Sequence, residues 1–187
     1  MHYTLADLIT DITQNGVESG ADLVELEIIE TICKEKGEFR FTVRDNGKGM
    51  SPEELELAQD PFVTDGIKHP HRKVGLGLPF LIQTAKQSGG DWEMKSEKGN
   101  GTEVSAWFDT NNVDTPPVGD IPGLFQIVLL FSGPKEIVIR RSRLETNNRE
   151  KDIVYEIKKT ELIEVLGNLE DTESFLLLSQ YLNSMEE

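Results

Sequence analysis

Two glycine-rich segments constrain this chain more than any other feature, because each stands where one type of secondary structure gives way to another. Asp45-Asn46-Gly47-Lys48-Gly49 follows an alternating run at 39–44, and Val74-Gly75-Leu76-Gly77-Leu78 opens a helical pattern. Glycine permits sharp turns and lets a flat ligand approach the backbone closely. Amide groups freed at a helix start also bind anions. The two segments therefore favour an α/β domain with a site for a flat ligand that carries an anionic group, although glycines in such segments also serve plain turns.

Outside these segments, apolar residues recur in helical and strand patterns. Leu5, Leu8 and Ile9 follow Thr4 at helical spacing, which predicts a capped helix. Alternating apolar and polar residues predict strands. In chain order we expect a helix at 4–19, strands at 23–32 and 39–44, and a helix at 51–59. A further helix should begin between residues 75 and 78 and run to 88, followed by a hairpin of strands 92–96 and 103–108.

The composition changes at residues 110–123, where three prolines gather with Asn, Asp and Gly. Such clusters mark linkers or domain edges. We therefore expect a domain at 1–110, a linker at 111–123, and a small α+β region at 124–187 that packs beside the domain or forms a partner surface. Within that region we expect strands at 124–131, 135–143 and 152–157 and helices at 160–166 and 172–184.

Charge and composition narrow the classes of ligand and location. Asp and Glu number 34 against 19 Lys and Arg, which gives a formal charge of −15. Non-specific binding to nucleic acid needs clustered basic residues, so we exclude that class. No apolar stretch approaches the roughly 20 residues of a membrane-spanning helix and no signal-peptide pattern opens the chain, so we expect a cytoplasmic protein. The single Cys33 excludes an internal disulfide and a cysteine-based zinc site.

Four polar residues have the chemistry of a ligand site. Asp11 and Asn15 stand four residues apart, so one helix face carries both. A carboxylate beside an amide oxygen suits Mg²⁺, although the pair equally suits a solvated helix face. Asp45, at a strand end, can accept a hydrogen bond from the exocyclic amine of adenine, although the segment also fits an ordinary strand-to-helix turn. Thr102 follows Gly101 into the last strand of the first domain, where it can share a water or the base edge with Asp45.

Taken together, these segments resemble, in order and spacing, the motifs of the GHKL ATPase superfamily, which includes gyrase, the ninety-kilodalton heat-shock chaperone, histidine kinases and MutL-type ATPases. The resemblance spans about residues 4–109, and within it the first helix looks more like the MutL type and the segment from Gly75 more like histidine kinases. It rests on Asp45-x-Gly47-x-Gly49-Met50, Asp60-Pro61-Phe62-Val63-Thr64, Gly75-Leu76-Gly77-Leu78, Gly89-Gly90 and Gly101-Thr102. It implies a two-layer α/β sandwich, a mixed sheet covered by helices on one face.

The resemblance also implies ATP and Mg²⁺ as ligands and a role for each matching residue. Asn15 would hold Mg²⁺, and Asp11, in the position of a glutamate, would be the catalytic base. Asp45 would bind the adenine amine, and the loop 60–74 would be the ATP lid. The other nucleotide-binding residues would be Gly47, Gly49, Met50, Thr64, Arg72, Lys73, Gly75, Leu76, Gly77, Leu78 and Thr102.

Two departures from the family pattern limit the activity that we expect. Asp11 is one methylene shorter than glutamate, and a misplacement of about an ångström can cost a hundredfold in rate, so slow hydrolysis is expected. Glu18 stands where histidine kinases usually carry a lysine.

No helical hairpin with a phosphoacceptor histidine is apparent, since His69 and His71 lie in the expected lid. We therefore expect an ATPase or protein kinase that phosphorylates a partner in trans or hydrolyses ATP slowly in a regulatory role. The alternative is an ATP-gated interaction switch without turnover. The sequence also allows a homodimer. A third possibility, a scaffold that has lost its nucleotide, conflicts with the intact Asp45 and glycines.

Overall fold

The computed structural model describes residues 4–59 and 77–187 and has a six-stranded sheet at its centre. The strands are β1 (Leu23–Ile32), β2 (Glu38–Asp45), β3 (Asp91–Glu97), β4 (Gly101–Asp109), β5 (Glu136–Glu145) and β6 (Ile153–Lys158). Their order across the sheet is β3-β4-β2-β1-β5-β6. Neighbours run antiparallel except β1 and β5, which are parallel, so the sheet is mixed.

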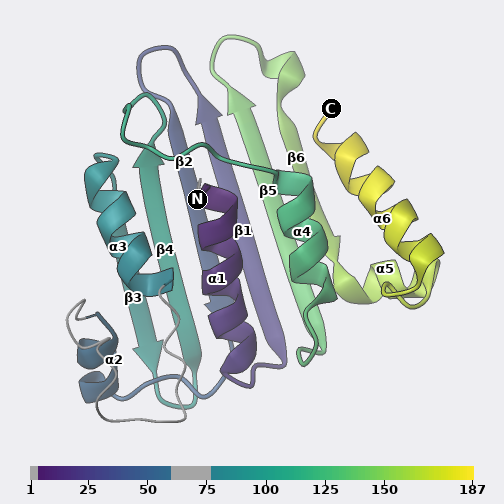
Figure 1. Ribbon diagram of the computed structural model, residues 1–187, viewed down its shortest axis with the longest axis horizontal. Helices are drawn as coiled ribbons and strands as arrows, with labels where there is room; N and C mark the ends of the chain where they lie inside the picture. The colour runs from purple at the N-terminus through teal and green to yellow at the C-terminus, as the bar shows by residue number, and fades with distance from the viewer. Residues whose placement is uncertain (1–3, 60–76) are drawn as a thin grey trace.

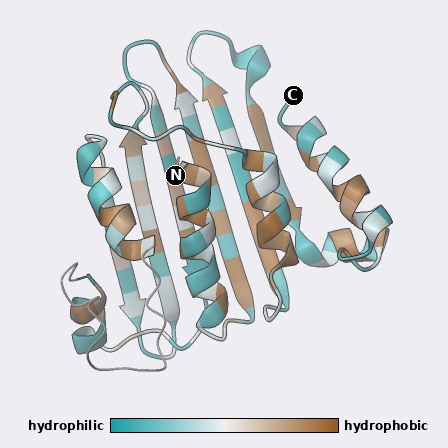
Figure 2. Cartoon of the chain, in the orientation of Figure 1, coloured by the Kyte–Doolittle hydropathy of each residue, from teal (hydrophilic) through white to brown (hydrophobic). Residues whose placement is uncertain are grey.

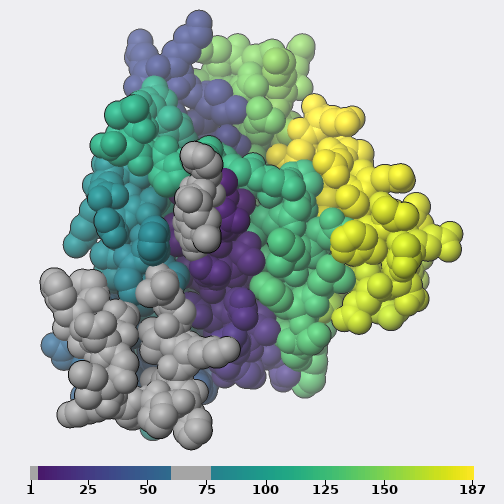
Figure 3. Space-filling model, in the orientation of Figure 1, coloured from purple at the N-terminus to yellow at the C-terminus, as the bar shows by residue number. Residues whose placement is uncertain are grey.

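Helices cover one face of this sheet (Figure 1). The helices are α1 (Leu5–Glu18), α2 (Pro52–Gln59), α3 (Gly77–Gln87), α4 (Ile121–Leu130), α5 (Lys159–Leu166) and α6 (Thr172–Met185), with a 3₁₀ turn at Arg149–Lys151. In the space-filling view α1 lies between α3 and α4 (Figure 3), and it contacts both, while α4 also contacts α6. The expected sandwich, with a mixed sheet covered by helices on one face, is confirmed.

Local sequence explains why α1 forms and which way it faces. The Thr4 hydroxyl accepts a hydrogen bond from the Asp7 amide at 3.1 Å, and the Asp7 carboxylate accepts one from the Thr4 amide at 2.9 Å. This reciprocal cap satisfies donors that a helix start leaves without partners. Leu8 and Ile12 are among the residues that α1 buries, one turn apart, against the sheet.

Alternation along the strands divides the sheet into a helix-covered face and an open face. On β2, Phe39, Phe41 and Val43 are buried under the helices, and the ring of Phe41 stacks on Phe108 of β4 with centroids 6.3 Å apart. The intervening residues point to the other side. Asp45 has the same parity as the buried residues, so the last residue of β2 lies on the helix side.

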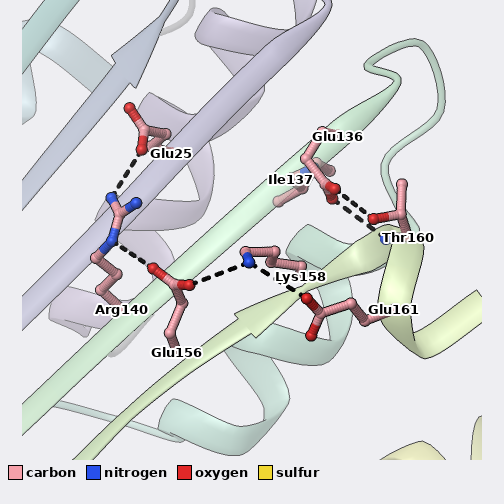
Figure 4. Close-up of polar contacts among 8 residues, drawn as sticks. All are labelled: Glu25, Glu136, Ile137, Arg140, Glu156, Lys158, Thr160 and Glu161. Atoms are coloured by element: carbon pink, nitrogen blue, oxygen red, sulfur yellow. Dashed lines mark hydrogen bonds and ion pairs between the residues drawn. The ribbon is translucent and has the colours of Figure 1, made fainter.

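The open face carries cross-strand ion pairs. Arg140 of β5 reaches Glu25 of β1 at 2.7 Å and Glu156 of β6 at 2.8 Å, and Lys158 continues the row (Figure 4). Charged side chains of opposite sign on neighbouring strands stabilise a sheet modestly and keep its surface hydrated. This face is therefore stable without a second layer of helices.

One expected element is wrong: residues 124–131 are not a strand, because Ile121–Leu130 form helix α4. The Asp120 carboxylate accepts a hydrogen bond from the Gly123 amide, and Pro122 stands in the first turn, where its missing amide costs nothing. Residues buried by α4 recur at helical spacing, namely Ile121, Leu124, Phe125, Val128 and Leu129. Further apolar residues between them hide this period (Figure 2), so the run resembled a buried strand.

Residues 124–187 complete the same sheet. Strands β5 and β6 extend it beyond β1, and α4 packs beside α1 on the covered face. The proline-rich stretch before α4 is bonded to the first helix, since the carbonyls of Pro117 and Val118 accept hydrogen bonds from the amides of Leu5 and Ala6. In the described parts of the chain, no helix combines the length and apolar character needed to cross a membrane.

Candidate functional site

The candidate site is centred on Asp45, at the end of β2 beneath the C-terminal half of α1. Its partner across the sheet is Thr102 of β4. Gly16 of α1 lies directly above it, since a β-carbon on Gly16 would be 3.4 Å from the Asp45 β-carbon. The structure therefore brings together three segments that are far apart in the sequence: the first helix, the turn after β2, and the start of β4.

Hydrogen bonds hold the Asp45 carboxylate in one orientation. Oδ1 accepts from the Gly47 amide at 2.8 Å and from the Ser19 hydroxyl at 2.9 Å. Burial raises the pKa of Asp45, and hydrogen bonds from Gly47, Ser19 and the Thr102 backbone partly offset that rise. The second oxygen, Oδ2, lies on the side of Gly16.

The turn after β2 approaches two other segments so closely that it requires glycine. Gly49 has a φ of 58°, and a β-carbon there would collide with the Glu97 carbonyl at the end of β3. Gly101 has a φ of 85°, and a β-carbon there would collide with the Asp45 carbonyl. Both positions combine a left-handed backbone with a close contact, which only glycine tolerates without strain.

Ser96 of β3 organises the side of the site formed by Met50 and Thr102. Its hydroxyl lies 2.9 Å from each of three groups, the Met50 amide, the Gly101 carbonyl and the Thr102 hydroxyl. A serine hydroxyl has one hydrogen, and the Gly101 carbonyl can only accept. All three contacts are satisfied when Ser96 donates to Gly101 and Thr102 donates to Ser96. The lone pairs of the Thr102 hydroxyl oxygen are then directed away from Ser96.

Asp11 and Asn15 lie on the exposed side of α1, one turn apart. Asp11 faces the start of α3, since a β-carbon on Gly77 would lie 3.0 Å from the Asp11 β-carbon. Gly77 and Leu78 are the first two residues of α3 and are buried. The start of α3, where backbone amides favour negative charge, thus lies beside Asp11.

The remaining candidate residues cannot be placed in this arrangement. Thr64, Arg72, Lys73, Gly75 and Leu76, and the expected lid at 60–74, lie outside the described residues. Within 4–59 and 77–187, no group of three or more His, Cys, Asp or Glu side chains is placed to hold a metal ion.

Three residues of the site were not identified from the sequence. Ser19 and Ser96 act across long sequence separations, so no local pattern points to them. Asn46 does have a local signal, because Asp-Asn-Gly is a turn sequence. Its side-chain oxygen accepts from the amides of Asp22 and Leu23, both at 2.9 Å, and so fastens the turn to the start of β1.

Part of the chain is similar in sequence to several known proteins. DNA mismatch repair protein MutL of Exiguobacterium sibiricum is 36% identical over 105 residues, which cover 54% of this chain and 16% of MutL. Sensor histidine kinase ZraS of Salmonella typhimurium is 36% identical over 85 residues, or 43% of this chain and 17% of ZraS. Histidine protein kinase DivJ of Caulobacter vibrioides is 37% identical over 70 residues, or 37% of this chain and 12% of DivJ. The chain spans less than a fifth of each of these relatives.

Residues 3–112 match the family described as histidine kinase-, DNA gyrase B-, and HSP90-like ATPase. The matched range contains α1, the turn after β2, α3 and the β3–β4 hairpin, and therefore every described residue of the candidate site. The resemblance inferred from the motifs is confirmed. The chain belongs to the histidine kinase-, DNA gyrase B- and HSP90-like ATPases, the GHKL superfamily.

Proposed function

We propose that this protein binds ATP with Mg²⁺ and uses it either to phosphorylate a partner protein or to hydrolyse it slowly in a regulatory role. The observation that carries the proposal is the Asp45 carboxylate, which two donors hold by Oδ1 beneath α1. An oriented carboxylate is an acceptor for the exocyclic amine of adenine. Thr102 and Met50 flank it from β4 and the turn after β2.

The described residues also fit Mg²⁺. This ion usually takes one or two protein oxygens and fills its other positions with water and substrate phosphates. The exposed side-chain amide oxygen of Asn15 supplies one such ligand. Bound there, Mg²⁺ would neutralise charge on the phosphates. Gly77 and Leu78, at the start of α3, would direct backbone amides toward the same phosphates.

We assign Asp11 the part of proton acceptor. Its carboxylate is exposed on α1 beside the start of α3, so a water or a partner's hydroxyl can reach it. A positioned carboxylate that takes a proton from the attacking oxygen typically contributes 10²–10⁴-fold in rate. Because aspartate is shorter than glutamate, we expect turnover at the low end of what such a site allows.

Titration calorimetry of the full chain with ATP, with and without Mg²⁺, tests this function. We expect Mg²⁺-dependent binding by the wild type, and at least a tenfold loss in Asp45→Asn, because its amide can present a donor to the donor on the base. Asp114→Asn is the matched control, since Asp114 is exposed and remote from the site. Unchanged affinity in Asp45→Asn would show that the site is assigned wrongly, and no binding by the wild type would refute the function.

An ATP-gated interaction switch is the alternative, and exposed apolar side chains on α6 favour it. Phe175, Leu176 and Leu177 are 40%, 56% and 47% exposed, which suits a partner surface. Asp11→Asn separates the two functions when phosphate release and ATP affinity are measured on the same sample. A kinase or ATPase loses turnover and keeps its affinity, whereas a switch has no turnover to lose.

A further inference from the structure

Ser19 lies at the C-terminal end of α1, between that helix and Asp45. Its hydroxyl oxygen is 2.7 Å from the Gly16 carbonyl oxygen and 2.9 Å from Asp45 Oδ1. A serine at a helix end ordinarily bonds to its own helix. Here the hydroxyl also reaches a carboxylate 26 residues away in the sequence, so one hydrogen is shared between a carbonyl and a charged acceptor. The bond to a charged acceptor is the stronger kind.

We propose that Ser19 is a positioning residue of the nucleotide site, whose hydroxyl fixes the Asp45 carboxylate so that Oδ2 is the acceptor presented to the exocyclic amine of the base. The inference rests on the proposed ATP-binding function. It adds a residue that determines how strongly an amino-substituted purine is preferred over one with a carbonyl at the same position.

The Asp45 carboxylate needs this restraint because rotation about its Cβ–Cγ bond is only loosely restricted. Ser19 and the Gly47 amide both bind Oδ1, and two donors on one oxygen define the plane of the group. Oδ2 then lies near Gly16, where a β-carbon would be 3.6 Å from it. With the hydroxyl removed, Oδ1 keeps only the bond from the Gly47 amide, and the carboxylate gains freedom to turn.

Ser19 is itself held in place, so it can act as a fixed support. Its amide donates to the Asn15 carbonyl at 3.1 Å, and its carbonyl accepts from the Lys48 amide at 3.3 Å. Gly47 leaves the room that the contact needs, because a β-carbon there would collide with the Ser19 hydroxyl. A site whose supporting residues are fixed before the ligand arrives loses less entropy on binding.

Ser19→Ala tests the proposal when affinities for ATP and for inosine triphosphate, each with Mg²⁺, are measured by calorimetry. Inosine triphosphate carries a carbonyl oxygen where ATP has its amine, so an acceptor directed at that position forms no hydrogen bond with it. We expect the variant to bind ATP about three- to tenfold more weakly and inosine triphosphate as the wild type does. The preference for ATP falls by the same factor. Equal losses for both nucleotides, or no loss for either, would overturn the proposal.

Three further variants serve as controls for the loss of the hydroxyl. Ser19→Gly also lacks the hydroxyl and suits a helix end, so it gives the same test if Ser19→Ala folds poorly. Ser19→Thr keeps a hydroxyl and should keep the preference for ATP. Ser105→Ala is the matched control, because Ser105 lies on the open face of β4.

A pH profile supplies a readout that a merely structural role would not change. The Ser19 hydroxyl lowers the pKa of Asp45 against the effect of burial. Since Asp45 must be ionised to accept from the amine, ATP affinity falls as the pH drops through this raised pKa. We expect Ser19→Ala to move that fall to higher pH, and a profile that coincides with the wild type would count against the proposal.

Asp45→Asn separates failure of this inference from failure of the proposed function. If Asp45→Asn loses the preference for ATP while Ser19→Ala retains it, the nucleotide site stands and the positioning role is wrong. If the wild type binds ATP and inosine triphosphate equally well, Asp45 does not read the base, so its assignment and the Ser19 role are both wrong while ATP binding stands. If the wild type binds neither nucleotide, the proposed function itself is wrong.

Discussion

Arg140 and Arg141 are neighbours on β5, yet they face opposite sides of the sheet. The Arg140 side chain is 39% exposed on the open face, where it pairs with Glu25 and Glu156 (Figure 4). The Arg141 side chain is 1% exposed on the helix-covered face, and its nitrogens lie 2.5 Å from Glu30 and 3.0 Å from Glu186. An arginine paired with glutamates therefore occurs once on an exposed face of the sheet and once buried beneath the helices.

The comparison shows that burial, rather than the number of ion pairs, decides what an arginine contributes. Burial by itself lowers the pKa of Arg141, but hydrogen bonds and attraction from Glu186 and Glu30 outweigh it and leave that pKa raised. The partners are themselves mostly buried, so each charge depends on the other. Exposed pairs such as those of Arg140 exchange their partners for water at little cost.

The largest effect that we expect comes from Arg141→Ala. It leaves Glu30 and Glu186 without their buried cation, which typically costs about 3–5 kcal/mol of unfolding free energy. Urea denaturation followed by circular dichroism measures the loss. A loss below about 1 kcal/mol would mean that water reaches this cluster and that the two faces do not differ as described.

A smaller loss is expected for Tyr155→Phe, which removes one donor from the same cluster. The Tyr155 hydroxyl donates to Glu186 at 2.6 Å, and such a bond contributes about 1.5–3 kcal/mol. Burial, then the Glu186 carboxylate, raise the pKa of Tyr155. The contribution of this hydrogen bond to the free energy of unfolding is therefore fully present below about pH 10, the pKa of an unfolded tyrosine. It is lost as the pH rises above that value.

Denaturation of wild type and Tyr155→Phe between pH 7 and 11 checks this sign. The difference in stability should narrow above about pH 10. A difference that stays constant or widens there would contradict the buried, protonated phenol.

The smallest effect is expected for Arg140→Ala on the open face. Exposed ion pairs contribute about 0–1 kcal/mol, and salt screens them. Urea denaturation at low and high salt should show a loss of at most about 1 kcal/mol that shrinks as salt is added. A loss as large as that of Arg141→Ala, or one that salt leaves unchanged, would remove the distinction between the faces.

The sequence predicted most of the fold because its periodic patterns are local. The helix that becomes α1, the strands at 23–32 and 39–44, and the C-terminal helices at 160–166 and 172–184 all have clear patterns and match described elements. The run at 124–131 failed because apolar residues fill the positions between its buried ones. The capping signal of Asp120 and Pro122 would have identified a helix there.

The candidate site was less accessible to sequence reasoning, because its supports depend on tertiary packing and strand pairing. Asp45 and its glycines stand in a motif. Ser19, however, meets Asp45 only after α1 packs on β2, and Ser96 meets the site only after β3 pairs with β4. The buried arginine could have been found. Arg141 has the same parity as Ile137 and Ile139 on β5, whereas Arg140 does not.

The parallel pairing of β1 with β5 has a consequence for synthesis and truncation of this chain. Leu23 pairs with Glu136, which lies 113 residues later, so one edge of β1 stays unpaired until most of the protein has been made. An unpaired edge of ten residues that includes Val24, Leu26 and Ile28 is a template for aggregation. A fragment that ended with the family match at residue 112 would keep that edge permanently.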